Sequence, residues 1–314
     1  MGAIDGTEYF SSKAIHCEDC SHRELSNGKT NYFHSALTPV IVQPANETVI
    51  SLESEFIVPQ DGHEKQDCEI QAAKRWVEKW GDFYARRGVT MLGDDLYSCE
   101  PFCRTLKDKH CHFILVCKPD SHTQLYQTVA FLAANGVLGS KAVRRWTGKF
   151  AEICTYRYAN KLPMTGEADA LAVNWCEVTI TREDTGEQLY KKAFATDFEI
   201  TDTTVEAIVR DGRARWKVEN ENHNVLKTKG YHIEHNFGHG SQHLASLLLS
   251  LNLLAFLFHT VLDLVDEQYR AIRQALGTRR RFFQDKEALL RYFQFENWDA
   301  VLAFMFKGLE LDIG

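Results

Sequence analysis

Short apolar runs separated by turns occupy the first sixty residues. Residues 32–42 and 48–58 are rich in β-branched and aromatic side chains, and a polar stretch with a proline separates them. Runs of this composition with a turn between them are typical of strands. The pattern predicts that the chain begins as a β-meander.

Helical spacing replaces this pattern after residue 61, because apolar residues recur three and four positions apart as far as Arg87. Gly88 ends this predicted helix. The elements predicted next are a strand over 89–92, a helix over 100–109, a buried strand over 113–117 and a helix over 125–134. Strands that alternate with helices predict an α/β sheet.

Strand patterns return at 150–158, 172–181 and 189–195, and a helical pattern follows. The predicted divisions are 1–140 as the first part of an α/β core, 141–200 as a β-rich insertion, 201–290 as the helical second part of the core, and 291–314 as a helical tail. The run 244–262 contains no Asp, Glu, Lys or Arg. It is long enough to span a bilayer, but polar residues interrupt it, and we predict a helix buried on all sides.

Composition and charge narrow the functional classes. With 44% apolar and 25% charged residues the chain is globular rather than disordered or collagen-like. Its net charge of −7 differs from that of a protein that simply coats DNA, so any contact with nucleic acid depends on local basic patches. Nine scattered cysteines and no secretory signal predict free thiols in a reducing cytoplasm.

Three carboxylates lie where predicted elements end. Asp5 follows an apolar strand start, Asp94 follows the strand at 89–92, and Glu219 lies on a predicted helix. Clustered like charges are costly unless a cation neutralises them. Carboxylate oxygens suit Mg²⁺, and two such ions activate a nucleophile for in-line phosphoryl transfer. Spacing alone does not separate this triad from an ordinary turn residue, a strand-end residue and a solvated helix face.

Two stretches near these carboxylates resemble the DDE-type insertion-sequence transposases. The stretch AIDGTEYFSS at 3–12 places Asp5 at the first catalytic aspartate of that family. The stretch LGDDLYS at 92–98 resembles the family signature Asp-x-Gly-Tyr. Tyr97 sets the register that makes Asp94 the match, whereas Leu96 replaces the glycine and leaves Asp95 as a neighbouring alternative.

A third stretch, RARWKVENENHNVLK at 213–227, resembles the family signature Tyr-x2-Arg-x3-Glu-x6-Lys. Arg215 precedes Glu219 at the spacing that the signature requires. The sequence departs from the signature at one position on each side of this pair. Gly212 occupies the tyrosine position, and the lysine position falls on Leu226, with Lys227 next to it. The three motifs occur in the family's order, with the β-rich stretch between the second and the third.

The resemblance implies an RNase H-like mixed sheet flanked by helices, with a β-rich insertion before the third acidic residue. Asp5, Asp94 and Glu219 would hold two Mg²⁺ ions, with Mn²⁺ as a substitute. A transposase of this kind hydrolyses one strand at each element end and then uses the freed 3′-hydroxyl to attack target DNA. The implied partners are transposon ends, target DNA and a second copy of the chain on DNA, with no membrane, in the cytoplasm at the nucleoid. The basic residues expected to contact DNA are Arg215, Lys227, Arg144, Arg145, Arg279, Arg280 and Arg281.

Members of this family usually carry a helical region that binds the DNA ends ahead of the first catalytic strand, whereas four residues precede Asp5 here. We expect a truncated copy that binds transposon ends weakly. A catalytically inactive remnant that still binds DNA is the alternative.

The segment His16-Cys17-x2-Cys20-x-His22 is the sharpest local metal pattern. Cys17 and Cys20 have zinc-knuckle spacing, and His22 or His34 is a candidate to complete a structural Zn²⁺ site. Free thiols with surface histidines are the alternative. Four further histidines, at 232, 235, 239 and 243, lie among glycines that disfavour a regular helix. For these we expect hydrogen bonds or contacts to DNA phosphate rather than metal.

A rival enzyme hypothesis is a metal-dependent hydrolase that uses Asp61, His63 and Asp67. The second histidine of the metalloprotease helix is absent from this segment. Asp61 with Glu64 three residues later also matches a capping box, which is the favoured interpretation.

Overall fold

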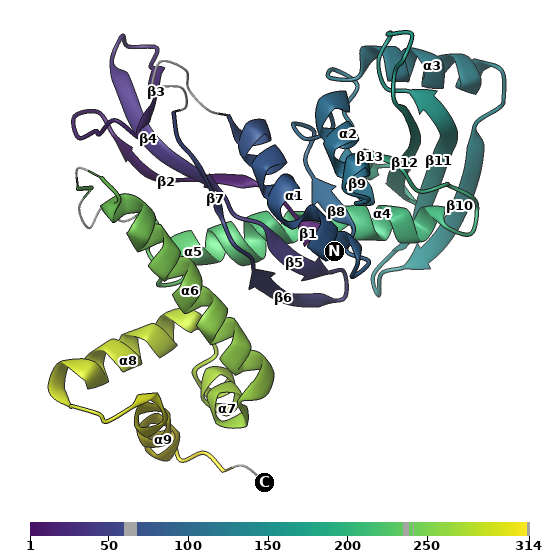
Figure 1. Cartoon of the computed structure of the whole chain (residues 1–314). Helices are drawn as coiled ribbons and strands as arrows, with labels where there is room; N and C mark the ends of the chain where they lie inside the picture. The colour runs from purple at the N-terminus through teal and green to yellow at the C-terminus, as the bar shows by residue number, and fades with distance from the viewer. Residues whose placement is uncertain (60–67, 235–238, 241, 313–314) are drawn as a thin grey trace.

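A nine-stranded mixed sheet forms the centre of the molecule (Figure 1). The computed structural model describes residues 1–59, 68–234, 239–240 and 242–312. The strand order in the sheet is β10-β11-β12-β13-β9-β8-β1-β5-β6. Its strands are β1 (Gly2–Ala3), β5 (Val40–Gln43), β6 (Asn46–Ser51), β8 (Met91–Gly93), β9 (Phe113–Val116), β10 (Gly139–Trp146), β11 (Ala151–Pro163), β12 (Ala172–Arg182) and β13 (Gln188–Thr196).

Helices cover both faces of this sheet, as the α/β prediction requires. The helices are α1 (Glu69–Ala85), α2 (Glu100–Asp108), α3 (Thr123–Ala134), α4 (Val205–Arg213), the π-helix η1 (Val218–His223), α5 (Asn224–Thr228), α6 (Leu244–Val265), α7 (Glu267–Leu276), α8 (Arg279–Tyr292) and α9 (Trp298–Gly308). Alternate residues of β9 show the two faces. Phe113 and Leu115 belong to the apolar core that includes residues of α1, α2 and α3, whereas Ile114 and Val116 belong to the core on the α4 side. A strand covered on both faces is apolar throughout, which explains this run.

The segment predicted as an insertion continues the central sheet. Strands β10 to β13 pair antiparallel in sequence, and β13 pairs antiparallel with β9, so that Ala195 lies opposite Leu115. Strand β10 is the outermost of the four and was missed by pattern reading, because arginines and other polar residues dominate its half-exposed sequence. Most of the segment 141–200 lies in these four strands, and its role as an insertion stays a prediction.

A smaller sheet lies beside the first (Figure 1), with the order β2-β4-β3 and with β7 paired to β4. Its strands are β2 (Gly6–Ser12), β3 (Ser21–Glu24), β4 (Thr30–Leu37) and β7 (Glu55–Ile57). The two long strands predicted over 32–42 and 48–58 are therefore wrong in detail. The chain passes from the small sheet into the large one between β4 and β5, and it returns between β6 and β7. Asp5 lies at the matching crossing between β1 and β2, and its carbonyl accepts a hydrogen bond from the amide of Thr38 at 3.0 Å.

The helical second half contains one element that differs from its prediction. Helix α6 is not buried on all sides, because about a third of its most apolar window is buried. An exposed stripe runs along it at spacings of three and four residues, formed by Leu247, Leu251, Leu254, Phe258 and Val261. By length and composition α6 is long and apolar enough to cross a membrane, and it is the one such helix in the described ranges.

Candidate active site

Asp5 and Asp94 follow two neighbouring parallel strands at the centre of the large sheet. Ala3 of β1 pairs with Leu92 of β8, and the amide of Ile4 donates to the Leu92 carbonyl at 2.9 Å. Asp5 and Asp94 each lie two residues beyond this pair, and Asp94 is close enough to help raise the pKa of Asp5. The two aspartates that the motifs single out are therefore brought together by strand pairing.

The neighbouring residue Asp95 has a different role. Its Oδ1 accepts from the amide of Lys118 at 2.6 Å, and its Oδ2 accepts from the hydroxyl of Ser121. These bonds tie the turn after β8 to the loop between β9 and α3. Asp94, in contrast, is close enough to Asp5 to raise the pKa of that carboxyl. These contacts favour Asp94 over Asp95 as the partner of Asp5, and its catalytic role stays a prediction.

Glu69, the first residue of α1, is a fourth carboxylate at this place. Its Oε1 accepts from the amide of Gly6 at 3.0 Å and from the hydroxyl of Tyr97. A Cβ on Gly6 would lie 2.4 Å from Glu69 Oε2, so a larger residue there would displace the Glu69 carboxylate. The sequence did not predict Glu69 as a site residue, because no motif contains it and the predicted helix began several residues earlier.

Arg215 connects two of the predicted carboxylates. Its guanidinium lies 3.6 Å from Asp5 Oδ2 through Nη1 and 2.6 Å from Glu219 Oε1 through Nη2. The Arg215 side chain is 13% exposed and that of Glu219 is 54% exposed. Glu219 thus stands at the open rim of the cluster, and Arg215 lies between it and Asp5. A contact of Arg215 with DNA phosphate stays a prediction.

A buried lysine fixes the start of the helix that carries Glu219. Lys217 is 3% exposed, and its Nζ donates to the carbonyls of Gln43 at 2.9 Å and Pro44 at 3.0 Å. These bonds attach the beginning of η1 to the turn between β5 and β6. Upstream, a Cβ on Gly212 would lie 2.8 Å from both Ile114 and Phe194. Helix α4 therefore packs too closely on the sheet to accommodate the tyrosine of the family signature.

The third motif contains a π-helix between Glu219 and Lys227, which changes the face on which Lys227 lies. A π-helical turn takes i→i+5 bonds and holds more residues than an α-helical turn. Between Glu219 and Lys227 the chain passes through η1, so Lys227 reaches the face that the preceding residue would occupy in an α-helix. Leu226 is fully buried, whereas Lys227 pairs with Glu234 at 2.6 Å. Such π-helical turns often mark functional sites.

Burial and mutual repulsion set the protonation of the cluster. Burial is the main cause that raises the pKa of Asp5 from 3.8 to about 7; Arg215 opposes this rise, and Glu69, Asp94 and Glu219 add to it. Near neutral pH Asp5 therefore holds a proton for part of the time when no cation is bound. Burial, followed by the carboxylates of Glu69, Asp5 and Asp94, also raises the pKa of Tyr97, which keeps its hydroxyl protonated as a donor to Glu69. A divalent cation would relieve the repulsion.

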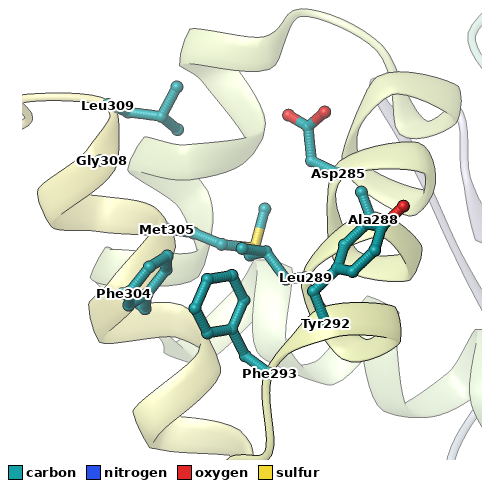
Figure 2. A pocket seen from close by; sticks show the side chains of 9 residues that line it. All are labelled: Asp285, Ala288, Leu289, Tyr292, Phe293, Phe304, Met305, Gly308 and Leu309. Carbon is teal, nitrogen blue, oxygen red and sulfur yellow. The ribbon is translucent and has the colours of Figure 1, made fainter.

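Two cavities differ in chemistry. A polar cavity of about 540 Å³ is lined by residues that include Glu69 of the cluster, Gly6, His223 and Lys227, whereas Asp5, Asp94 and Glu219 are not among its lining residues. A second cavity of about 390 Å³ lies between α8 and α9, where mainly apolar side chains surround Asp285 (Figure 2). The second cavity contains none of the predicted site residues. The carboxylate cluster and the polar cavity beside it form the candidate active site.

The predicted basic patches lie apart from one another. On β10, Arg144 pairs with Glu183 at 2.8 Å and Arg145 pairs with Glu152 at 2.6 Å, so both are partly neutralised. At the start of α8, Arg279 lies over the ring of Phe256 at 5.5 Å. The remaining two cations of that patch, for which no ion pair is found within the described chain, are exposed: Arg280 and Arg281. Contact of these residues with DNA stays a prediction.

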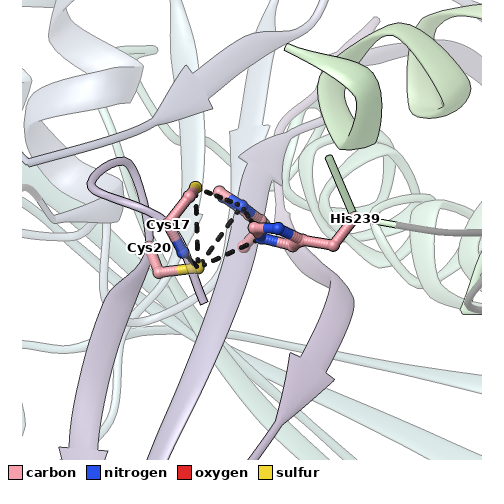
Figure 3. Close-up of side chains that lie close together, drawn as sticks. Cys17, Cys20 and His239 are labelled. Atoms are coloured by element: carbon pink, nitrogen blue, oxygen red, sulfur yellow. Dashed lines mark hydrogen bonds between the residues drawn. The ribbon is translucent and has the colours of Figure 1, made fainter. Parts of the chain in front are cut away.

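Three of the four predicted zinc ligands lie close together, and a histidine that was not predicted as a ligand joins them. Cys17, Cys20 and His34 converge, and the fourth member of the cluster is His239, so a metal ion could be held here (Figure 3). The prediction of His22 as a ligand is wrong. Pairing of β3 with β4 sets it opposite Tyr32, whose ring it contacts at 6.4 Å, on the exposed side of the small sheet.

His239 was expected to hydrogen bond or to contact DNA phosphate instead. It lies 219 residues from Cys20, and sequence spacing carries no signal for so distant a partner. In the absence of a cation, burial and the neighbouring His239 lower the pKa of His34 to about 4, and burial raises the pKa of Cys20 to about 11.

The rival hydrolase residues Asp61, His63 and Asp67 lie outside the described residues, as does His235. No family model matches this chain, and no curated protein matches it either.

Proposed function

We propose that this chain is the catalytic part of a DDE-type DNA transposase, which cleaves DNA strands and transfers them by metal-dependent phosphoryl transfer. The observation that carries the proposal is the parallel pairing of β1 with β8, after which Asp5 and Asp94 come close enough for Asp94 to raise the pKa of Asp5. Arg215 then connects Asp5 to Glu219, which lies in a distant part of the sequence. Carboxylates from three motifs, of which the first and third lie more than 200 residues apart in sequence, are thus close enough to affect one another's charge.

The donor set fits magnesium. Asp5, Asp94 and Glu219 would hold two Mg²⁺ ions, or Mn²⁺ in their place, which would stabilise the attacking and leaving oxygens. Cation binding favours the charged form of Asp5, whose carboxyl otherwise retains a proton near neutral pH. With Asp5 and Glu219 as cation ligands, Arg215 would be free to pair with a DNA phosphate. Glu69, held by Gly6 and Tyr97, stays in place as a fixed negative charge behind Asp5.

The architecture supports the same proposal. The central sheet is mixed, with β1, β8 and β9 parallel and β5 and β6 antiparallel, and helices cover both faces. We assign this core as RNase H-like, with β10 to β13 as the insertion before Glu219. The substrates are transposon ends and target DNA, the active form is a homodimer on DNA, and the place of action is the cytoplasm at the nucleoid.

A nicking assay on supercoiled plasmid tests the proposal. We expect the purified chain to convert supercoiled DNA to open circles with Mg²⁺ or Mn²⁺ and to produce no nicks in EDTA. Asp5→Ala, purified in parallel, should lack the activity because one aspartate of the metal site is gone.

Two other outcomes would favour the alternatives. Binding of DNA without any metal-dependent nicking would indicate an inactive remnant. Nicking that persists in Asp5→Ala but is lost on substitution of His63 would favour the hydrolase hypothesis. In either case the transposase proposal would fail for this chain.

A further inference from the structure

The four atoms of the Cys/His cluster are spaced like the ligands of one tetrahedral ion. The sulfurs of Cys17 and Cys20 lie 3.9 Å apart, and the sulfur–nitrogen distances to His34 Nε2 are 3.6 Å and 3.4 Å. A tetrahedron with Zn–S near 2.3 Å and Zn–N near 2.05 Å requires about 3.8 Å between sulfurs and about 3.6 Å between sulfur and nitrogen. These three distances lie within about 0.2 Å of the tetrahedral values.

His239 supplies the fourth corner. Its Nε2 lies 3.4 Å from Cys20 Sγ and 2.9 Å from His34 Nε2, and all four ligand atoms lie within 4.8 Å of one another. The same tetrahedron requires about 3.3 Å between its two nitrogens. The Nδ1 of His239 is 2.7 Å from the carbonyl of Gly240, which places the proton on Nδ1 and leaves the Nε2 lone pair for a metal.

Hydrogen bonding alone does not account for the convergence. His34 Nε2 has three neighbours within 3.6 Å, yet one ring nitrogen either donates one proton or accepts through one lone pair. A disulfide is excluded, because its sulfurs would lie about 2.05 Å apart. His34 Nδ1 has no hydrogen-bond partner in the described part of the chain, so a metal on Nε2 would be what fixes its tautomer.

The surroundings are those of a closed structural site. Cys20, His34 and His239 are each 6% exposed or less. The rings of Tyr9 and Phe10 pack against the histidines, at 5.8 Å from His34 and 4.4 Å from His239, and form an apolar shell. Four protein ligands leave no open position for a substrate, which distinguishes this site from a catalytic one.

We propose that Cys17, Cys20, His34 and His239 bind one structural Zn²⁺ that links the small sheet to the segment between α5 and α6. Two ligands come from the β2–β3 loop, one from β4, and the fourth from the second half of the chain (Figure 3). The ion holds the small sheet, whose strand β2 begins at Gly6 beside the carboxylates, close to His239. The site thereby braces one side of the polar cavity without contacting its substrate.

Zinc content and affinity test this inference. We expect one zinc per chain by mass spectrometry after dialysis against metal-free buffer. We expect Cys20→Ser and His239→Asn to bind zinc at least about 100-fold more weakly in competition with a chromophoric chelator. The matched controls His22→Asn and Cys99→Ser should retain wild-type affinity, since neither residue belongs to the cluster. Removal of zinc should lower the melting temperature on the order of 10 °C.

A second measurement needs no variant. The full chain reconstituted with Co²⁺ should show the visible absorption of a tetrahedral ion with thiolate ligands. Absence of both bound zinc and this spectrum would overturn the inference, and equal zinc affinity in His239→Asn and wild type would overturn the four-ligand site. These readouts involve no DNA, so their failure leaves the proposed DNA cleavage untouched, and the reverse also holds.

Discussion

Asp94→Asn is expected to lower the rate of Mg²⁺-dependent DNA nicking by about 10³-fold or more. The substitution removes a negative charge beside Asp5 at the place where the cations would be held, and an amide is a much weaker ligand for Mg²⁺. The neighbouring substitution Asp95→Asn is the matched control. Its side chain is engaged by the amide of Lys118 and the hydroxyl of Ser121, so we expect a nicking rate close to that of wild type.

Rates of plasmid nicking under single-turnover conditions, with melting temperatures of all three proteins, check this pair. The melting temperatures show whether a loss of rate reflects the site or the fold. The account would be contradicted if Asp95→Asn lost the activity and Asp94→Asn retained it, since the motif register would then be displaced by one residue.

Asp5→Asn is expected to stabilise the metal-free protein at pH 8 by about 2–4 kcal/mol while it removes activity. The cause is the pKa of Asp5, which rises from 3.8 to about 7, mainly through burial. The folded state holds this proton more tightly than the unfolded state does. The stabilising contribution is thus complete below about pH 4, is lost as the pH rises to about 7, and stays lost above it.

Thermal melts in EDTA between pH 4 and pH 9 check the sign. The difference in melting temperature between Asp5→Asn and wild type should grow as the pH rises toward 7 and then level off, reaching roughly 5–10 °C. Mg²⁺ should raise the melting temperature of wild type and leave that of Asp5→Asn nearly unchanged, because the cation replaces the proton at Asp5. A variant that is less stable than wild type at pH 8 would show that Asp5 is not held in a strained, buried environment.

The hydrophobic pattern predicted elements correctly where a strand is buried on both faces or a helix on one face. The apolar run at 113–117 became β9, and the helix predicted over 100–109 became α2. The meander failed because strand pairing across two sheets depends on contacts distant in sequence, such as the bond from Thr38 to the Asp5 carbonyl. The prediction that α6 is buried on all sides was wrong, because hydrophobicity alone does not indicate which face of a helix the rest of the molecule covers.

The candidate site was predicted from motif likeness rather than from physics. Asp5 and Asp94 are placed by strand register, which follows from their positions after apolar strands. Glu69 and His239 were missed, since each reaches its partners only through tertiary packing. Lys227 lies one residue beyond the lysine position of the motif. The π-helix η1 precedes it, and no simple sequence rule identifies a π-helical turn.

Diffraction from crystals soaked in Mn²⁺, measured at the manganese absorption edge, is the most direct test of the central claim. We predict anomalous density beside the carboxylates of Asp5 and Asp94, within coordination distance of both, with Glu219 turned toward it. The account would be contradicted by crystals at saturating Mn²⁺ that show no such density there, with Arg215 still joining Asp5 to Glu219.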